Sequence, residues 1–396
     1  MSDFFKMSEI LKFQMPKRFV FGNGAIKDIG DEARMVFGKN KKIMVVTDKG
    51  VVNAGLIDDA VKSLENAGYN TVIFDEVTPE PPVSIVLKGI DIARSEKVDL
   101  IFGIGGGSPI DSAKAISVMV PYEGEIHDYL GEYRVRKPGL PMMFVPTTAG
   151  TGAELSNTFV LTDDVKTQEK LSSQSLYTYA DLALVDPELT KNLPQRITAE
   201  SGLDAFSHAL ECFVGLRSNP LSELFSFRGI ELIAQNLRKA YNNGPDDPEA
   251  RYAMCLGVCM GTLGVRSSAT GNVHATCYPM ARKYHLSHGR AIALMMPAVM
   301  EFNLIGNPAK YAAVAGALGE ETAGLSPAEA AGKSVEAVKR LISDLNLPTR
   351  LRDMGVKEAD FPGLAKSVVT NYPRLTSNNP RQMTESDVID IYQAAY

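Results

Sequence analysis

The sequence predicts two domains, an α/β domain with a parallel sheet over residues 1–193 and an all-helical domain over residues 194–396. Three observations predict them. Short apolar runs alternate with helical patterns in the first half, strand-like runs end near residue 195, and two prolines, Pro187 and Pro194, interrupt the chain between the halves. The length of 396 residues agrees, because domains average about 150 residues.

The apolar runs of the first half have the length of buried strands. They cover residues 41–48, 71–76, 98–105, 141–148 and 181–186. Between them, residues 55–68 and 81–97 carry apolar side chains at three- and four-residue spacing, which is typical of helices. Strands that alternate with helices predict a parallel sheet with right-handed crossovers.

Composition restricts the kind of partner. The net charge is −6 and the chain has no basic tract, which argues against nucleic acid and against an anionic membrane surface. Four cysteines, no signal-peptide pattern and no apolar run of 18 residues predict a reduced, cytoplasmic protein that does not span a membrane. A small-molecule partner is therefore expected. Residues 1–16 precede the first expected strand and are a candidate for an N-terminal arm.

Three consecutive glycines, Gly105 to Gly107, stand between a predicted strand and a predicted helix. Glycines in such a turn let the backbone approach an anion, and the helix N-terminus offers free amides, so the turn predicts phosphate binding. Ser108 and Asp111 have capping-box spacing, with Pro109 expected at the first helical position, and both could serve only as a helix cap. Asp48, at the end of the first apolar run, is either a ribose-binding acid that favours NAD over NADP or a helix N-cap.

A second turn, PTTAGTGAE at residues 146–154, follows another apolar run. It carries three hydroxyl side chains, those of Thr147, Thr148 and Thr151. Loops at the carboxyl ends of parallel strands are where α/β folds bind ligands. The turn is either part of that ligand site or an ordinary polar loop.

Four of the five histidines lie in the stretch from His208 to His288. Asp204 and His208 are four residues apart in a helical pattern, so both can face one cation. His274 and His288 would lie about 21 Å apart on an unbroken helix, and we expect Pro279 to let the chain fold back between them. One carboxylate with three imidazoles suits Fe(II) or Zn(II), and spacing alone leaves His285 and His288 as competitors for the last position.

Together these segments resemble the iron-containing (group III, metal-dependent) alcohol dehydrogenases, from about residue 15 to the C-terminus. The matching motifs are GGGSPIDSAK (105–114), PTTAGTGAE (146–154), ESGLDAFSHALE (200–211), GNVHATCYP (271–279) and HLSHGRAIALMMP (285–297). The resemblance implies a Rossmann-like domain that binds NAD(P) and a helical domain that binds one divalent metal, the two-domain plan of dehydroquinate synthase, with substrate in the cleft between. It also implies a homodimer or higher oligomer.

The resemblance implies roles for individual residues. The implied metal ligands are Asp204, His208, His274 and His288, which leaves His285 out. The implied nucleotide contacts are Asp48, Gly105, Gly106, Gly107, Ser108, Asp111, Thr147, Thr148, Thr151 and Lys170.

The chain departs from the family pattern near the implied metal. Tyr278 stands where members commonly carry a second histidine that relays a proton. Members also often have glycine at Arg282 and an uncharged residue near Arg266, and with Lys283 these two cations flank the implied metal site in sequence. These three cations are either solvated surface charges or ligands for an anionic group on the substrate, such as a carboxylate or sulfonate.

The function predicted from these patterns is reversible hydride transfer between NAD(H) and a small, possibly anionic aldehyde or primary alcohol. The metal, Fe(2+) or alternatively Zn(2+), would polarise the carbonyl, with Tyr278 and His288 as the catalytic residues. The alternatives are a dehydroquinate-synthase-like lyase, which would need a denser basic lining, and a metal-dependent hydrolase, which would leave the glycine turn without a role.

Overall fold

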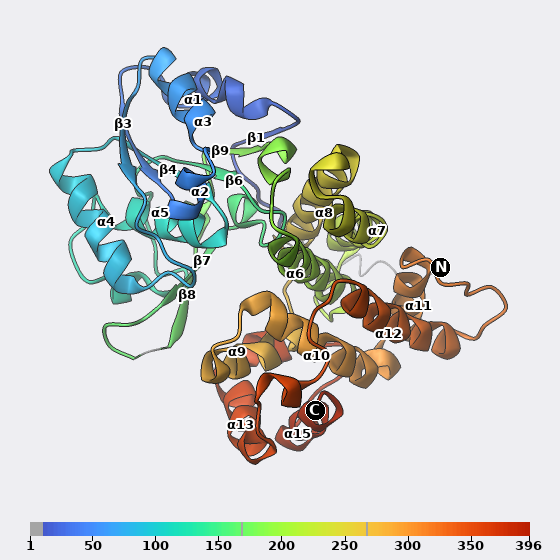
Figure 1. The fold of residues 1–396 in the computed structure, drawn as a ribbon. Coiled ribbons are helices and arrows are strands. Elements are labelled where there is room, and N and C mark those ends of the chain that lie inside the picture. Colours follow the sequence, from blue (N-terminus) through green and yellow to red (C-terminus); the bar gives the residue numbers. More distant parts are fainter. Residues whose placement is uncertain (1–10, 168, 267) are drawn as a thin grey trace. The chain divides into compact units, whose positions relative to one another are not determined.

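Six parallel strands form the main sheet, and all except β1 match the predicted apolar runs (Figure 1). They are β1 (Arg18–Phe21), β2 (Lys42–Val46), β3 (Asn70–Phe74), β4 (Leu100–Gly105), β6 (Met142–Pro146) and β9 (Leu182–Val185). Their order is β1-β9-β6-β4-β2-β3, and every neighbouring pair is parallel. The chain therefore turns from one side of β2 to the other when it passes from β3 to β4.

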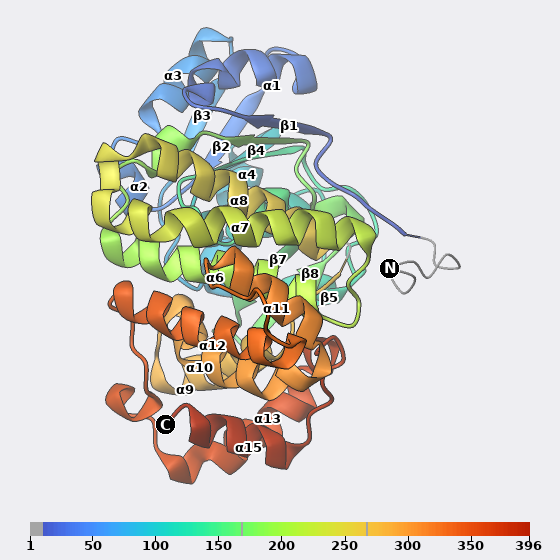
Figure 2. The same cartoon turned by 90° about the vertical axis from the view of Figure 1, so that its right-hand side faces the viewer.

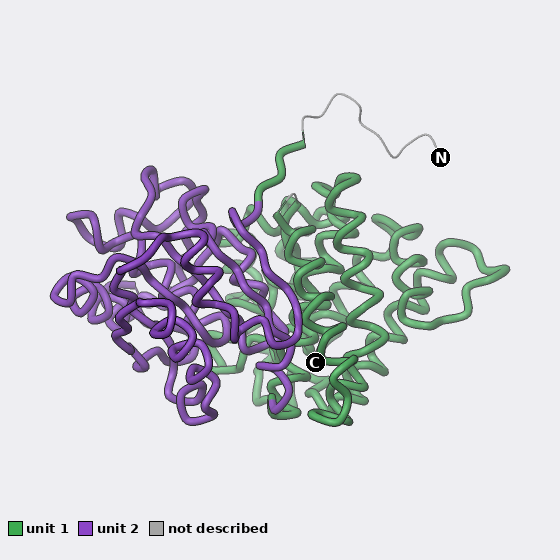
Figure 3. The backbone as a smooth tube through the Cα atoms, turned by 90° about the horizontal axis from the view of Figure 1, so that it is seen from above, with its two compact units in different colours: residues 1–14, 193–396 green, residues 15–192 purple. Residues whose placement is uncertain are grey.

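The computed structural model describes residues 11–167, 169–266 and 268–396, so the first ten residues of the candidate arm lie outside the described residues. The chain forms two compact units, which have different colours in Figure 3. We call Met15–Asn192 the sheet unit, and Leu193–Tyr396 with the segment Met1–Gln14 the helical unit.

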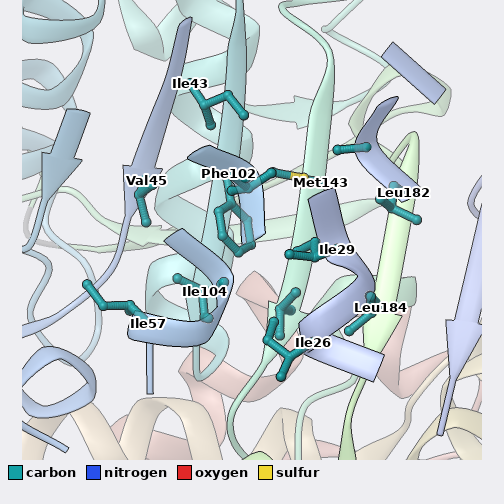
Figure 4. Packing of buried hydrophobic residues seen from close by; sticks show 14 of the residues in the cluster. Ile26, Ile29, Ile43, Val45, Ile57, Phe102, Ile104, Met143, Leu182 and Leu184 are labelled. Carbon is teal, nitrogen blue, oxygen red and sulfur yellow. The ribbon is translucent and has the colours of Figure 1, made fainter. Parts of the chain in front are cut away.

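Helices cover both faces of the six-stranded sheet. They are α1 (Ile29–Phe37), α2 (Lys49–Asn53), α3 (Asp58–Asn66), α4 (Val83–Ser95) and α5 (Gly107–Met119). Ile29 of α1 and Ile57 before α3 pack with alternate residues of the strands, among them Val45, Phe102 and Leu184 (Figure 4). On the other face, a Cβ at Gly103 would lie 2.8 Å from the Cβ of Ala113, so α5 packs directly on β4. Burial on both faces explains why the central strands β2, β4, β6 and β9 are continuous apolar runs, whereas the edge strands β1 and β3 are only partly buried.

A second, three-stranded sheet was not anticipated from the sequence. Its strands are β5 (Gly131–Glu132), β7 (Thr158–Thr162) and β8 (Lys170–Gln174), in the order β5-β8-β7. In β7 only Phe159 and Leu161 are buried, with threonines at both ends. Such short, alternating strands leave a much weaker apolar signal than the doubly covered strands of the main sheet.

The described residues from 193 onward contain helices and no strand, as predicted for this half of the chain. The helices are α6 (Gln195–Val214), α7 (Pro220–Asn243), α8 (Pro248–Arg266), α9 (Asn272–Tyr284), α10 (His288–Asn303), α11 (Pro308–Ala317), α12 (Pro327–Asp344), α13 (Phe361–Asn371), α14 (Pro373–Thr376) and α15 (Glu385–Ala394). Figure 2 shows α7 lying along α8, and α6 packs against both. Nowhere in the described chain does a helix have the length and apolar character needed to cross a bilayer.

The starts of α7, α12 and α15 follow the capping rules. Asn219 accepts bonds from the backbone amides of Leu221 and Ser222 at the start of α7, and Ser326 and Thr384 form capping boxes at α12 and α15. The predicted architecture, a parallel α/β sheet followed by an all-helical part, is thus confirmed.

Candidate functional site

The glycine turn lies at the switch point of the six-stranded sheet. Strand β4 ends at Gly105, whose φ is +147°, and a Cβ there would lie 2.6 Å from Pro109. Gly106 is the N-cap of α5 and provides no side-chain cap. Ligands of open α/β sheets bind outside the carboxyl ends of the strands at such a reversal, where a helix N-terminus can receive an anion.

The structure brings the other predicted nucleotide residues to this turn. A Cβ at Gly107 would lie 3.0 Å from Thr151 Cγ2, and one at Gly106 would lie 3.6 Å from Thr148 Oγ1. Thr147 joins the same place through its backbone, since its amide donates to Gly105 O at 2.9 Å. The threonine loop therefore lies directly beside the glycine turn, and the approach is tight at Gly107, where a Cβ would press on Thr151.

Asp48 is the N-cap that one of its two predictions describes, and its ribose contact stays a prediction. Its Oδ1 accepts a hydrogen bond from the backbone amide of Val51 at 3.0 Å, so it is the N-cap of α2. Its Oδ2 lies 3.6 Å from the position of a Cβ on Gly105. One carboxylate oxygen thus caps the helix, while the other faces the glycine turn.

The expected capping box of Ser108 and Asp111 is wrong. Helix α5 begins at Gly107, so Pro109 is its third residue, and Gly106 is the N-cap. Asp111 instead accepts a hydrogen bond from the backbone amide of Val160 at 3.1 Å, which ties α5 to β7. Because burial disfavours the charged form, the pKa of Asp111 is raised to about 6.

Lys114 has a place that sequence reasoning missed. Its side chain is fully buried, and its Nζ donates to the carbonyls of Ala153, Ser156 and Thr158 at 2.7, 2.8 and 2.8 Å. The carbonyl of Ala153 belongs to the threonine loop, and those of Ser156 and Thr158 come just after it. A lysine seven residues after the glycine turn, in a helix whose other residues carry no positive charge, was the available signal.

Lys170, the last predicted nucleotide residue, is engaged elsewhere. Its Nζ pairs with Glu80 Oε1 at 2.7 Å on the three-stranded sheet. Among the described contacts, none joins Lys170 to the glycine turn, so its role beside the ribose stays a prediction.

Three helices of the helical unit bring one carboxylate and three imidazoles together. Asp204 Oδ1 lies 3.8 Å from His208 Nε2, 3.5 Å from His274 Nε2 and 3.2 Å from His288 Nε2. Asp204, His274 and His288 each offer a ligand atom within 4.8 Å of the other two. His208 lies outside this tight group, but its ring stacks on that of His274 with centroids 4.7 Å apart.

Buried polar atoms without partners test whether a cation fits here. Asp204 Oδ1 and His274 Nε2 are buried, and neither has a hydrogen-bond partner in the described part of the chain. Unpaired atoms of this kind are costly, and a divalent cation would satisfy them together. The donor set of one carboxylate and three imidazoles fits Fe(II) or Zn(II), as the sequence predicted.

The electrostatics of the cluster favour a positive charge. Burial opposes ionisation of Asp204, but His208 and His288 hold its pKa well below the ordinary value. Burial also opposes protonation of His274, yet the carboxylates of Glu211 and Asp204 raise its pKa to about 9. At His208 burial prevails and lowers the pKa to about 4. The two carboxylates therefore create a site where a cation is stabilised.

Glu211 is the residue of the cluster that sequence reasoning missed. Its Oε2 contacts His274 Nδ1 at 2.5 Å, and its Oε1 accepts a hydrogen bond from the backbone amide of Val273 at 2.6 Å. The signal was present, because Asp204, His208 and Glu211 are spaced by four and three residues and so share one face of α6.

The chain folds back after α9 and not at Pro279. Helix α9 runs without a break through Pro279, so the predicted break there is wrong. The reversal occurs at His285, the C-cap of α9, which has φ +53°, and α10 begins at His288. Proline provides no backbone N–H inside α9 but does not end the helix, and His285 supplies the left-handed residue of the turn.

Gly289 sets the position of His288. A Cβ at Gly289 would lie 2.4 Å from the backbone oxygen of Glu200 in α6. The start of α10 can approach α6 this closely only with glycine at this position. The approach places His288 opposite Asp204.

Tyr278 lies against the cluster. Its ring stacks on His288 with centroids 5.5 Å apart and contacts the edge of His274 at 5.9 Å. Burial, together with nearby anionic groups, raises the pKa of Tyr278 well above its usual value. The phenol therefore holds its proton at neutral pH.

The three predicted substrate cations have different surroundings. Lys283 Nζ pairs with Asp360 at 2.6 Å. Arg282 follows Tyr278 by one helical turn on α9, and its charge acts on Tyr372, whose ring lies 5.4 Å from that of Tyr278. Arg266 is close to Cys212, where its charge opposes the rise in that thiol's pKa that burial causes. Arg282 is therefore connected to the metal-ligand cluster through two aromatic rings, because Tyr372 contacts Tyr278 and Tyr278 stacks on His288.

Comparisons with known proteins agree with both halves. Residues 16–187 match the model of the iron-containing alcohol dehydrogenases, and residues 198–396 match that of the C-terminal part of the same family. Long-chain-alcohol dehydrogenase 1 of Geobacillus thermodenitrificans is 36% identical over 95% of this chain and 94% of that protein. The crystal structure of a 1,3-propanediol oxidoreductase has a TM-score of 0.94 and 34% identity, covering 98% of this chain and 100% of that one.

A third comparison includes a nucleotide. Sulfoacetaldehyde reductase from Bifidobacterium kashiwanohense, solved in complex with NAD+, has a TM-score of 0.85 and 27% identity, and covers 98% of this chain and 99% of that one.

The sheet has a glycine turn suited to phosphate binding, and the helical unit has a carboxylate and three imidazoles suited to a divalent metal. Together these features are typical of metal-dependent, nucleotide-linked dehydrogenases. This chain belongs to the iron-containing alcohol dehydrogenase family and is an oxidoreductase. The predicted cofactors, iron and NAD(H), agree with the family and with the NAD+ complex of the relative.

Proposed function

We propose that this protein interconverts a small aldehyde and its primary alcohol with NAD(H), at a divalent metal held by Asp204, His208, His274 and His288. The observation that carries the proposal is the convergence of three imidazole Nε2 atoms on Asp204 Oδ1, in a chain of this family. When bound, the metal supplies Lewis-acid polarisation of the carbonyl, and the nicotinamide carries the hydride.

The residues around the glycine turn would bind the nucleotide. Free amides of Gly106 and Gly107 at the N-terminus of α5 would receive the pyrophosphate, flanked by the hydroxyls of Thr148 and Thr151. The oxygen of Asp48 that faces the turn supports NAD over NADP, because a carboxylate accepts the ribose 2′-hydroxyl and repels a 2′-phosphate.

Tyr278 would act as a neutral hydrogen-bond donor next to His288. Its raised pKa keeps the phenol neutral, so it can donate a hydrogen bond toward an oxygen in the site but cannot act there as a base. The stacked contact with His288 supports this role.

We further propose that the substrate carries a carboxylate or sulfonate and that Arg282 binds it. Arg282 is exposed, and its charge acts on Tyr372, whose ring lies 5.4 Å from that of Tyr278 beside the metal ligands. The name of one relative, a sulfoacetaldehyde reductase, supports an anionic substrate. The names of the others, which refer to long-chain alcohols and 1,3-propanediol, favour neutral ones, so the substrate needs a direct test.

The test follows NADH absorbance at 340 nm with propanal, succinate semialdehyde and sulfoacetaldehyde, with and without added Fe(II). Activity that requires Fe(II) is expected, and full activity after exhaustive chelation would contradict the proposal. Hydrolysis or elimination without NADH oxidation would favour a hydrolase or a lyase.

The anionic substrate is tested by Arg282→Ala, with Lys283→Ala as the matched control. Losing a charge-assisted contact of about 1.5–3 kcal/mol should raise KM for the anionic aldehyde by about tenfold or more, and leave KM for propanal unchanged. Equal changes for both aldehydes, or for both variants, would refute the assignment. A homo-oligomer and a cytoplasmic location stay predictions.

A further inference from the structure

The carboxylate of Glu211 uses both of its oxygens inside the helical unit. Oε1 accepts from the amide of Val273, and Oε2 contacts Nδ1 of His274. The side chains of Glu211 and His274 are only 6% and 1% exposed. Water therefore has little access to this contact.

The contact decides which nitrogen of His274 carries the ring proton. A neutral imidazole has one N–H, and a carboxylate is an acceptor only, so the nitrogen that faces it must be the donor. When a cation takes the place of the proton on Nε2, the proton that stays on Nδ1 leaves the Nε2 lone pair for the metal, beside Asp204 Oδ1 at 3.5 Å. Metals bind the unprotonated nitrogen.

We propose that Glu211 is a positioning residue that holds His274 in the Nδ1-protonated form, so that Nε2 is ready to bind the metal. The inference rests on the metal site of the proposed function. It assigns a role to a residue that contacts neither substrate nor metal and acts only through His274.

The surroundings of Glu211 keep its carboxylate from turning. Val273 is the second residue of α9, where backbone amides have no partner within the helix, so Glu211 serves as the cap. A Cβ at Gly271 would lie 3.2 Å from Oε1, so the chain passes close to the carboxylate on that side. Behind it, Asn303 and Asn379 donate to each other at 2.8 and 2.6 Å.

The other two imidazoles lack such a partner among the described contacts. The Nδ1 atom of His288 lies 3.8 Å from the sulfur of Cys277, which is a weak interaction. In the described part of the chain, no carboxylate contacts the Nδ1 atom of His208. His274 is thus the imidazole whose ring proton is fixed by an ionic acceptor. In metal sites, removal of such an outer carboxylate costs about 10–100-fold in affinity.

Glu211→Gln tests the proposal with almost no change in shape. The amide of Val273 still requires an acceptor, so the Gln oxygen must stay there and its NH2 group must face Nδ1. Nδ1 then becomes an acceptor, and the ring proton moves to Nε2, the atom that should bind the metal. Glu200→Gln is the matched control, because Glu200 is a buried acid of the same helix that pairs with Arg290 and contacts no imidazole.

Two measurements read the result. Zn²⁺ titration of metal-free protein should give a Kd about 10–100-fold higher for Glu211→Gln than for wild type, with Glu200→Gln unchanged. Long-range ¹H–¹⁵N NMR of zinc-loaded, histidine-labelled wild type should place the His274 proton on Nδ1, and the five histidines keep this spectrum simple.

The outcomes separate the inference from the proposed function. Wild type that binds neither Zn²⁺ nor Fe²⁺ refutes the metal site itself. Wild type that binds Zn²⁺, with Glu211→Gln within twofold of it, overturns the role of Glu211. If the variant does not fold, the wild-type spectrum still tests the proposal, because a proton elsewhere than Nδ1 of His274 contradicts it.

Discussion

Replacing Gly289 by alanine should weaken metal binding without touching any ligand. The new methyl carbon would lie 2.4 Å from Glu200 O, whereas Cβ atoms keep at least 3.0 Å from such atoms, so the start of α10 must move by at least 0.6 Å. His288 is the residue immediately before Gly289. Metal–ligand bonds tolerate only about 0.2 Å, so this movement is several times too large.

The cost follows from the same contact. Overpacking of this kind costs about 1–3 kcal/mol, and if a bound metal has to restore the original position, the affinity falls by about 10–100-fold. Calorimetric titration of chelator-treated protein with Zn²⁺ measures this directly. An affinity within twofold of wild type would refute the reasoning.

Gly332→Ala is the matched control for this prediction. Gly332 lies inside α12 with no atom within 4 Å of the new methyl group. Alanine is the better helix former there, so stability should rise by about 0.5–1 kcal/mol with no change in Zn²⁺ affinity. A loss of affinity in both variants would indicate a general effect of the substitution.

Three further predictions concern the two units separately. Lys114→Met removes the donor shared by three buried carbonyls and should destabilise the sheet unit by about 3 kcal/mol or more, which hydrogen exchange at residues 153–160 would detect as faster exchange. Burial raises the pKa of Glu154 to about 7, so the folded state binds its proton more tightly than the unfolded state does, and this stabilisation is complete below about pH 4.5 and lost as pH rises through 7. In denaturant unfolding, the free energy of unfolding should fall by about 3 kcal/mol between pH 4.5 and 8 in wild type, and Glu154→Gln should abolish this fall. An unchanged pH dependence in the variant would contradict the prediction. Chelation should speed exchange in α9 and α10 but not in β4 or β6, since a ligand at 1,000 times its Kd stabilises its own unit by about 4 kcal/mol.

The strands of the main sheet were predictable because helices cover both of its faces. Val45 and Phe102 face one layer of helices while Met44 and Ile101 face the other, so each strand is a continuous apolar run. Strand β7, in contrast, buries alternate residues only over a short length, and its pattern resembles that of a loop.

The metal cluster was predictable in composition but not in how its parts meet. Asp204 and His208 are linked by helical spacing, which the sequence displays. The approach of His288 depends on Gly289 against Glu200 O, a tertiary contact with no periodic pattern, and the turn at His285 depends on a left-handed backbone conformation. Glu211 could have been found by extending the helical spacing one step further.

Strand β1 has a consequence for the order in which the chain can fold. Within the described residues, the sole sheet partner of Arg18–Phe21 is Leu182–Val185, so the first of these strands to be synthesised waits for the last. Ribosomes add about 5–20 residues per second, which leaves β1 without its partner for about 10 s or more. Strand β9 also lies between β1 and β6 in the sheet. Pairing at this edge is therefore incomplete until nearly all of the sheet unit has left the ribosome. Early truncation of the chain before residue 182 therefore exposes not one but two unpaired strand edges.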